Sequence, residues 1–227
     1  PLSKQLYDEC VHFGVPEKKL QYIQNGVDLK EVEEYRLKKT NVIKAPEEER
    51  IIGFIGQMIP RKKVDHILEI FERLNAKYPN LRLEILGDGE SRPELEEQAK
   101  TLKSKDNIHF MGFRNDRLER LKNFDLFVMS SSDEGIPRCL MEAMAMGLIT
   151  VSTYHSGIPE LITHNESGLL APEHSPQEIA REITRLVNGE INTAQMRAMA
   201  KLKIEQSFEQ LKLYKELVGI LAKLNEF

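Results

Sequence analysis

From residue 51 onward, short apolar runs alternate with stretches of helical periodicity, and this alternation restricts the fold more than any other feature. IIGFIG at 51–56 has the composition of a buried strand, and the next stretch places apolar residues from Val64 to Tyr78 on one helix face. Repetition of this order predicts βαβ units with parallel strands. We therefore expect an α/β fold with a doubly wound parallel sheet. Its further strands are predicted at 81–87, 107–112, 125–130 and 148–152, and its further helices at 91–104, 115–122, within 134–147 and at 176–188.

The two flanks of this region lack the alternation. QYIQNGVD at 21–28 is predicted to be a short strand ending in a turn at Asn25–Gly26, after a mainly helical stretch at 1–20. The polar residues 29–50 include KAPEEER at 44–50, a segment typical of a linker. Residues 193–225 are predicted to form one or two helices whose apolar side chains need a surface to cover. These side chains are Phe208, Leu211, Leu217, Leu221 and Leu224.

Charge and hydropathy exclude two classes of partner. The formal net charge is −4, and the strongest basic cluster is only Arg61-Lys62-Lys63, so no nucleic-acid groove is indicated. No apolar run approaches the roughly 20 residues that span a bilayer. The first residues, PLSKQLYDEC, do not have the pattern of a signal peptide. We expect a soluble protein that faces the cytosol.

The residues that bind metals are absent or badly spaced. The two cysteines, Cys10 and Cys139, allow neither a disulfide framework nor a cysteine zinc site, and the six histidines show no ligand spacing. No Asp-x-Asp motif, a common holder of a divalent cation against a diphosphate, occurs. If the protein binds phosphates, basic side chains and backbone N–H groups must hold them.

Polar residues gather after two of the predicted strands. In GQMIPRKKVDH at 56–66, three cations crowd the start of a helix, where the helix dipole repels them. They either hold an anion or form a solvated basic turn. In LGDGESR at 86–92, Gly87 and Gly89 permit close approach of a ligand to the backbone, but a tight turn explains them equally well.

The third strand end, EGIPRCLMEAMAMG at 134–147, combines a helix start with charges in an apolar helix. The free N–H groups from Gly135 to Arg138 can receive a phosphate. Arg138 and Glu142 are spaced for an i, i+4 ion pair, which is the plain structural alternative. Such a pair does not explain Glu134. Two carboxylates around a phosphate-binding helix start suit a sugar nucleotide, with one carboxylate for each sugar ring.

Taken in order, these segments resemble the family 4 (group 1) retaining glycosyltransferases of GT-B fold. EGIPRCLMEAMAMG is similar to their Glu-x7-Glu segment, and NGVD at 25–28, GQMIPRKKVD at 56–65, LRLEILGDGE at 81–90, IHFMGF at 108–113 and SGIPELITHNESGLLAP at 156–172 continue the resemblance. The family has two Rossmann-like domains, and this chain resembles the second, which binds the donor. The resemblance implies that residues 1–28 are the end of an N-terminal acceptor domain and an interdomain linker. It implies a donor domain at 29–192 and helices at 193–227 that pack back toward the N-terminal domain.

The resemblance also assigns roles to single residues. Lys62 matches the lysine on the donor diphosphate, Glu134 the glutamate at the transferred sugar, and Glu142 the glutamate that holds the ribose hydroxyls. Glu134 and Lys62 are thus the candidate catalytic residues. The other candidates for donor binding are Gln57, Arg61, Gly87, Gly135, Ile136, Pro137, Arg138, Phe113 and Arg114.

Two of these candidates leave alternatives open. Phe113 and Arg114 match the loop that borders the base, but Phe113 could equally belong to the core. Gln57 stands where the family usually has an arginine that pairs with the lysine on the diphosphate, and Lys63 replaces the usual glycine. Arg61, Lys63 or Arg138 could compensate for that lost charge. Otherwise the donor affinity is weak or the parent protein is catalytically degenerate.

The implied reaction is transfer of a sugar from a UDP- or GDP-linked donor to a hydroxyl acceptor, with retention and without a metal or another cofactor. The acceptor would bind through the N-terminal domain, so this chain alone is expected to bind donor without turnover. The parent could contact the inner face of the membrane peripherally. The rivals are a nucleotide-sugar-binding module that has lost transfer and a GT-B sugar-nucleotide epimerase.

Overall fold

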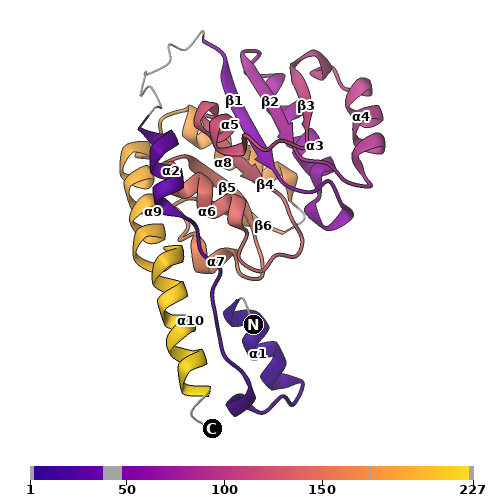
Figure 1. Ribbon diagram of the computed structural model, residues 1–227. Coiled ribbons are helices and arrows are strands. Elements are labelled where there is room, and N and C mark those ends of the chain that lie inside the picture. Colours follow the sequence, from indigo (N-terminus) through magenta and orange to yellow (C-terminus); the bar gives the residue numbers. More distant parts are fainter. Residues whose placement is uncertain (1–2, 38–47, 174, 225–227) are drawn as a thin grey trace.

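A computed structural model describes residues 3–37, 48–173 and 175–224. Its centre is one sheet of six parallel strands in the order β3-β2-β1-β4-β5-β6 (Figure 1). All crossovers are helical, which is the doubly wound, Rossmann-like arrangement. The predicted fold class is therefore confirmed. The strands are β1 (Arg50–Ile55), β2 (Leu81–Leu86), β3 (Ile108–Gly112), β4 (Leu126–Met129), β5 (Ile149–Tyr154) and β6 (Leu169–Pro172).

Helices follow the strands as the periodicity predicts. Asp65 in the first turn of α3 and Pro176 at the start of α8 are typical helix-start residues. The α-helices are α1 (Lys4–His12), α2 (Leu29–Arg36), α3 (Val64–Asn75), α4 (Arg92–Thr101), α5 (Arg117–Asn123), α6 (Arg138–Ala145), α7 (Ile158–Leu161), α8 (Pro176–Val187), α9 (Thr193–Ser207) and α10 (Gln210–Leu224). Three 3₁₀ turns are η1 (Glu17–Lys19), η2 (Pro60–Lys62) and η3 (Lys105–Asn107).

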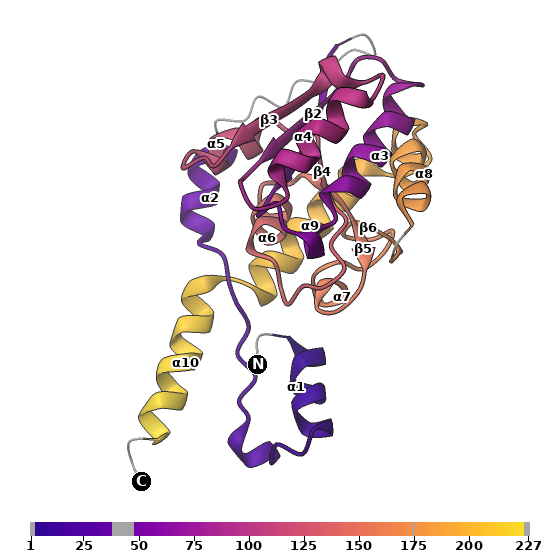
Figure 2. The same ribbon diagram turned by 90° about the vertical axis from the view of Figure 1, so that its right-hand side faces the viewer.

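Each face of the sheet has its own core. Alternate residues of β1 and β4 point to opposite faces, so Phe54 and Val128 join α3 and α8 in one core. Phe127 and Met129 join α5, α6 and α9 in the other. Helices lie on both sides of the sheet in Figure 2. Burial on both faces explains why the strands are almost continuously apolar.

The N-terminal flank differs from the prediction in two respects. The strand expected at 21–28 is wrong, because the described residues there pair only at a single bridge between Val27 and Glu209. An extended segment becomes a strand only beside another strand, and here its neighbour is the start of α10. The polar stretch at 29–50, for which no helix is predicted, contains α2, whose N-cap Asp28 accepts hydrogen bonds from Lys30 N and Glu31 N. Residues 44–47 of the KAPEEER stretch lie outside the described residues.

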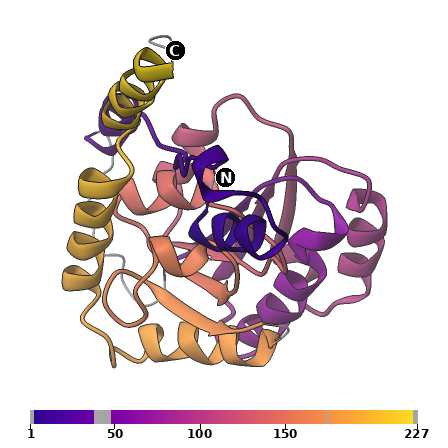
Figure 3. The same ribbon diagram turned by 90° about the horizontal axis from the view of Figure 1, so that it is seen from below.

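The C-terminal flank consists of two helices with different surroundings. α9 buries Met196, Ala200 and Ile204 against α6 and β5, and Phe208 closes its end. α10 projects from the same end of the body as α1 (Figures 1 and 3). Packing of the helices at 193–227 toward an N-terminal domain stays a prediction, and α10 has the more exposed apolar face. Its exposed apolar side chains Leu211, Tyr214, Val218 and Leu221 share one helix face, while Leu217 is half-buried and the Leu224 side chain lies outside the described part.

Candidate functional site

The centre of the sheet brings two distant loops together. β1 and β4 are neighbours, with Ile52 opposite Leu126, and the strand order reverses between them. In doubly wound sheets this switch point opens a crevice beyond the carboxyl ends of the strands. The loop after β1 forms η2, and the loop after β4 leads through Glu134 to α6. Hydrogen bonds from Ser130 Oγ to Lys63 O (2.6 Å) and from Ser132 N to Arg61 O (2.8 Å) join the two loops.

At this switch point the two predicted catalytic residues form a buried ion pair. Lys62 and Glu134 are each 7% exposed, and Lys62 Nζ donates to Glu134 Oε1. Arg61 Nη1 lies 3.3 Å from Glu134 Oε2 and donates to Asp133 O over 2.8 Å. Burying a carboxylate costs several kcal/mol unless cations and donors surround it. Three predicted residues are thus brought together, although Lys62 and Glu134 lie 72 positions apart in the sequence.

The backbone at Lys63 explains why a glycine suits the position after Lys62. Its backbone is left-handed, with φ 49°, where it ends η2 and begins α3. Residues with a Cβ pay roughly 1–2 kcal/mol for that conformation. The lysine at this position is consequently a strained choice.

Glu142 forms a second buried cluster on α6. It is 1% exposed and accepts hydrogen bonds from Arg138 Nε (2.9 Å) and Arg117 Nη2 (2.9 Å). Glu31 of α2 lies 3.5 Å from Arg117 and 3.8 Å from Arg138. The i, i+4 pair is therefore present, and Arg117, which the sequence analysis missed, completes it. Both arginines are the first residues of their helices, where the helix dipole disfavours a cation. This unfavourable position is the sequence signal that could have identified Arg117.

Cys139 connects the two clusters in space. It is the second residue of α6, and Lys62, Glu134 and Glu142 all act electrostatically on its thiol. Desolvation raises the pKa of Cys139 to about 12, so the thiol stays protonated at neutral pH. α6 begins between the two clusters without a side-chain cap at Pro137. The first N–H groups of the helix, predicted to bind phosphate from Gly135 to Arg138, therefore face no capping side chain.

The ends of β1, β2 and β3 are held together by backbone contacts. Gly56 N donates to Leu86 O (3.0 Å), Met58 N to Asp88 O (2.9 Å) and Gly87 N to Gly112 O (2.8 Å). Gly87 has φ +133°, and a Cβ there would lie 1.8 Å from Gly56 O. A close approach of two backbones thus requires this glycine. Gln57 lies exposed in the same loop.

The predicted base-bordering residues lie at the end of β3. Phe113 is 75% exposed, so the alternative that it belongs to the core is wrong. Arg114 pairs with Asp116 (Nε to Oδ1 2.6 Å), and this hydrogen bond lowers the pKa of Asp116 to about 2. A border with a base stays a prediction for both residues.

His155, just after β5, is a buried imidazole beside the Glu134 loop. It is 7% exposed, and neither ring nitrogen has a hydrogen-bond partner in the described structure. Burial lowers the pKa of His155. Nearby Glu173, Glu134 and Asp133 oppose that shift, and Lys62 adds to it.

His155 should make the chain less stable in mild acid. Its pKa is lower in the folded chain than the ordinary 6.5 of an unfolded chain. The unfolded chain therefore binds more protons, and stability should fall as the pH drops below about 6.5. Urea denaturation between about pH 7 and pH 5 measures this slope. His155→Gln should flatten it, whereas His109→Gln, at a half-buried histidine on β3, should not. Equal slopes for wild type and His155→Gln would contradict the assignment.

Within the described residues, no group of three or more His, Cys, Asp or Glu side chains could hold a metal ion. No helix of the described part is both long and apolar enough to span a membrane.

Comparison with known proteins identifies the family. The family described as glycosyl transferases group 1 matches residues 36–203, which include Glu134 and Glu142. The chain belongs to the group 1 glycosyl transferases. It is 32% identical over 232 residues to the amylovoran biosynthesis glycosyltransferase AmsK of Erwinia amylovora, covering 99% of this chain and 56% of that protein. The chain thus spans about half the length of the curated relatives it matches.

Solved structures of glycosyltransferases share the fold. HepE of Anabaena, crystallised with UDP-glucose, has a TM-score of 0.84 at 22% identity, over 98% of this chain and 62% of HepE. The C-terminal domain of the group 1 family protein LpcC of Francisella tularensis has a TM-score of 0.67 at 23% identity, over 81% of this chain and 99% of that domain. At this identity the likeness shows the fold, which is that of the C-terminal half of a GT-B glycosyltransferase.

Proposed function

We propose that this chain is the donor-binding part of a retaining glycosyltransferase that transfers a sugar from a nucleoside diphosphate sugar to a hydroxyl acceptor. The observation that carries the proposal is the arrangement of two buried carboxylates, Glu134 and Glu142, on either side of the start of α6. Each carboxylate is paired with cations, and both lie near the switch point where such sheets bind ligands. This arrangement matches the two sugar rings and the diphosphate of one donor molecule.

The proposed chemistry relies on fixed positive groups. When the bond to the sugar breaks, negative charge develops on the leaving diphosphate. Lys62, Arg61 and the uncapped N–H groups at the start of α6 would stabilise that charge, because they are already oriented before the reaction. We assign Glu134 to orienting the sugar rather than to removing a proton. In this proposal no metal ion or other cofactor takes part.

Glu142 would hold the ribose, and its present contacts suggest how. Among the described residues, Oε1 accepts hydrogen bonds from Arg138 and Arg117, whereas Oε2 accepts one, from Arg117 Nε at 3.2 Å. A carboxylate oxygen has two lone pairs, so Oε2 can accept a further hydroxyl. Arg138 is half exposed and can turn away from Glu142 toward a diphosphate. The Arg138–Glu142 pair is then the contact of the donor-free state.

The rest of the reaction belongs to the longer parent protein. The exposed apolar face of α10 supports a role in packing on an acceptor domain, and this chain alone should bind donor without turnover. Because HepE was crystallised with UDP-glucose, UDP is the first donor fragment to test, and GDP the second. We place the parent in the cytoplasm, with peripheral contact at the inner membrane face.

The ribose assignment is tested with Glu142→Gln and isothermal titration calorimetry. A neutral amide keeps one acceptor but loses the charge, so the affinity for UDP should fall roughly tenfold or more. Uridine should lose affinity by the same factor, because the ribose is common to both. Glu69→Gln, at an exposed i, i+4 pair with Arg73 on α3, is the matched control and should bind UDP normally. Unchanged UDP affinity in Glu142→Gln would refute the assignment, and wild-type protein that binds neither UDP nor GDP would refute the function.

One observation favours a second candidate, a nucleotide-sugar-binding module that has lost transfer. Gln57 is neutral and exposed at the loop where the resemblance calls for an arginine. The longer parent protein decides between the two. If it binds donor but neither transfers the sugar nor slowly hydrolyses the donor, the binding module is the correct function.

A further inference from the structure

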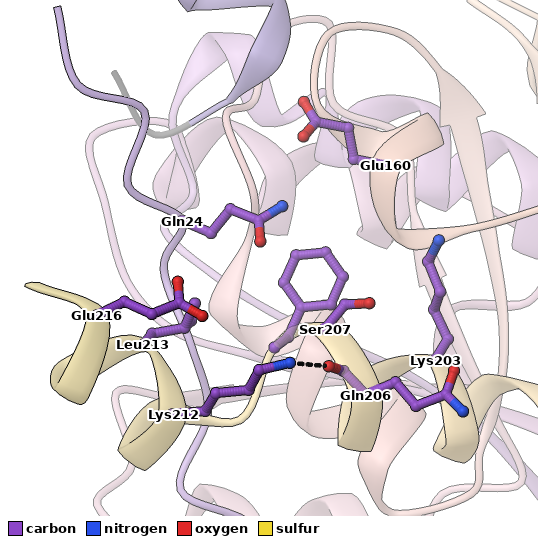
Figure 4. A pocket seen from close by; sticks show the side chains of 9 residues that line it. Gln24, Glu160, Lys203, Gln206, Ser207, Lys212, Leu213 and Glu216 are labelled. Atoms are coloured by element: carbon purple, nitrogen blue, oxygen red, sulfur yellow. Dashed lines mark hydrogen bonds between the residues drawn. The ribbon is translucent and has the colours of Figure 1, made fainter.

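A single carboxylate, Glu160 on α7, holds two separate parts of the N-terminal segment. Glu160 Oε1 accepts from Lys4 N over 2.7 Å, at the first residue of α1. Glu160 Oε2 accepts from the hydroxyl of Tyr22 in the extended segment before α2. Gln24 Nε2 donates to that same hydroxyl over 2.7 Å. Figure 4 shows Gln24 and Glu160 on the wall of one small cavity of about 280 Å³.

The turn that leads into α7 also touches the proposed sugar site. Gly157 N donates to Glu134 O over 3.2 Å, and Ser156 Oγ lies 3.3 Å from Asp133 Oδ1. A Cβ on Gly157 would lie 2.1 Å from Gly135 O and 3.2 Å from Ser3 Cβ. The turn is therefore closely packed between the Glu134–Gly135 backbone on one side and the start of α1 on the other.

We propose that Glu160 is a positioning residue for the donor site, because it fixes the 155–160 turn against the N-terminal segment and thereby sets the position of the Glu134–Gly135 backbone. This inference rests on the proposed function, in which Glu134 meets the transferred sugar. Glu160 itself does not touch the donor. It acts through Gly157, whose N–H holds the Glu134 carbonyl.

The hydrogen bond between Tyr22 and Glu160 should persist throughout the physiological pH range. Tyr22 is partly buried, and both burial and the hydrogen bond to Glu160 raise the pKa of Tyr22. Its hydroxyl therefore remains a donor throughout the physiological range. A charged acceptor makes each of the two hydrogen bonds stronger than a neutral one.

The proposal makes a selective prediction about the two ends of the donor. Glu134 is proposed for the sugar and Glu142 for the ribose, and the described contacts of Glu160 lead through Gly157 to Glu134 and its neighbour Gly135, not to Glu142. In Glu160→Ala, the affinity for UDP-glucose should fall roughly three- to tenfold, the size of one hydrogen bond's contribution, while the affinity for UDP stays within about twofold. Tyr22→Phe should lower the affinity for UDP-glucose relative to that for UDP in the same way, but by a smaller factor. Glu166→Ala, at an exposed glutamate in the next turn, should leave both affinities unchanged.

Hydrogen exchange supplies a readout that needs no ligand. Exchange of the backbone at 131–137 should quicken in Glu160→Ala, whereas the α6 backbone at 139–145 should not change. Equal loss of UDP and UDP-glucose affinity, or no loss of either, would overturn the inference. If the wild type binds neither UDP nor GDP, the proposed function fails, and the exchange rates at 131–137 then decide about the positioning role by themselves: unchanged rates overturn it.

Discussion

Lys62→Met should destabilise the chain by about 3 kcal/mol or more and remove most of its affinity for a nucleoside diphosphate. Among the described residues, the substitution leaves Arg61, at 3.3 Å, as the one cation paired with the buried Glu134. An uncompensated buried carboxylate is among the few changes that cost this much. Loss of one charge-assisted contact to a phosphate should by itself lower affinity roughly ten- to a hundredfold. Urea denaturation and calorimetry with UDP measure the two effects separately.

The double variant Lys62→Met with Glu134→Leu separates stability from binding. Replacing both members of a buried ion pair by apolar side chains is often neutral for stability. The double variant should therefore regain most of the lost stability, and Arg61 keeps its hydrogen bond to Asp133 O. It should still fail to bind UDP. Restored UDP binding would show that the Lys62–Glu134 pair is structural only.

Gly87→Ala should destabilise the chain still more, on the order of 4 kcal/mol or beyond, so that little folded protein is recovered. The new Cβ would lie 1.8 Å from Gly56 O, and neither atom belongs to a flexible side chain. The backbone of Gly87 is also at φ +133°, where alanine is strained. To relieve the contact, the ends of β1 and β2 must separate and break the Gly56 N to Leu86 O bond.

Gly147→Ala is the matched control for this substitution. Gly147 also has a positive φ, +75°, but a Cβ added there would meet no neighbouring atom within 4 Å. Its cost should be limited to the left-handed conformation, about 1 kcal/mol. The difference between the melting temperatures of Gly87→Ala and Gly147→Ala then separates the cost of the close contact from the cost of backbone strain. If Gly87→Ala is as stable as Gly147→Ala, the close approach at the strand ends is not essential.

The sequence predicted the sheet well because its signals are local. Apolar runs of the right length and helices with one apolar face occur within a few residues of each other, and they identify the strands β1 to β5 and the helices α3, α4, α5, α6 and α8. The segment at 21–28 shows where this reasoning stops. Its composition suits a strand, but pairing depends on a neighbour elsewhere in the chain, and among the described residues this segment forms a single bridge, between Val27 and Glu209.

The candidate site was predicted in its residues but not in its contacts. Lys62, Glu134 and Glu142 were all candidates, yet the direct pairing of Lys62 with Glu134 depends on β1 lying beside β4. Arg117 was missed because α5 is a short polar helix in which one more arginine draws no notice. Its partner Glu142 is 25 residues away, so no local spacing connects the two. Contacts between residues that lie far apart in the sequence depend on the tertiary fold and cannot be predicted from periodicity.

The position of β1 in the sheet has a consequence for how the chain is made. Of the six strands of this sheet β1 is synthesised first; β2 can then join one edge of β1, and β3 can join the far edge of β2, in the order of synthesis. Its other edge must wait for β4, whose first paired residue, Leu126, lies 74 positions after Ile52. Until then an apolar edge that includes Phe54 stays open to any strand of another nascent chain. The same strand order that brings Lys62 beside Glu134 thus leaves one edge of β1 without its partner from the synthesis of β1 until that of β4.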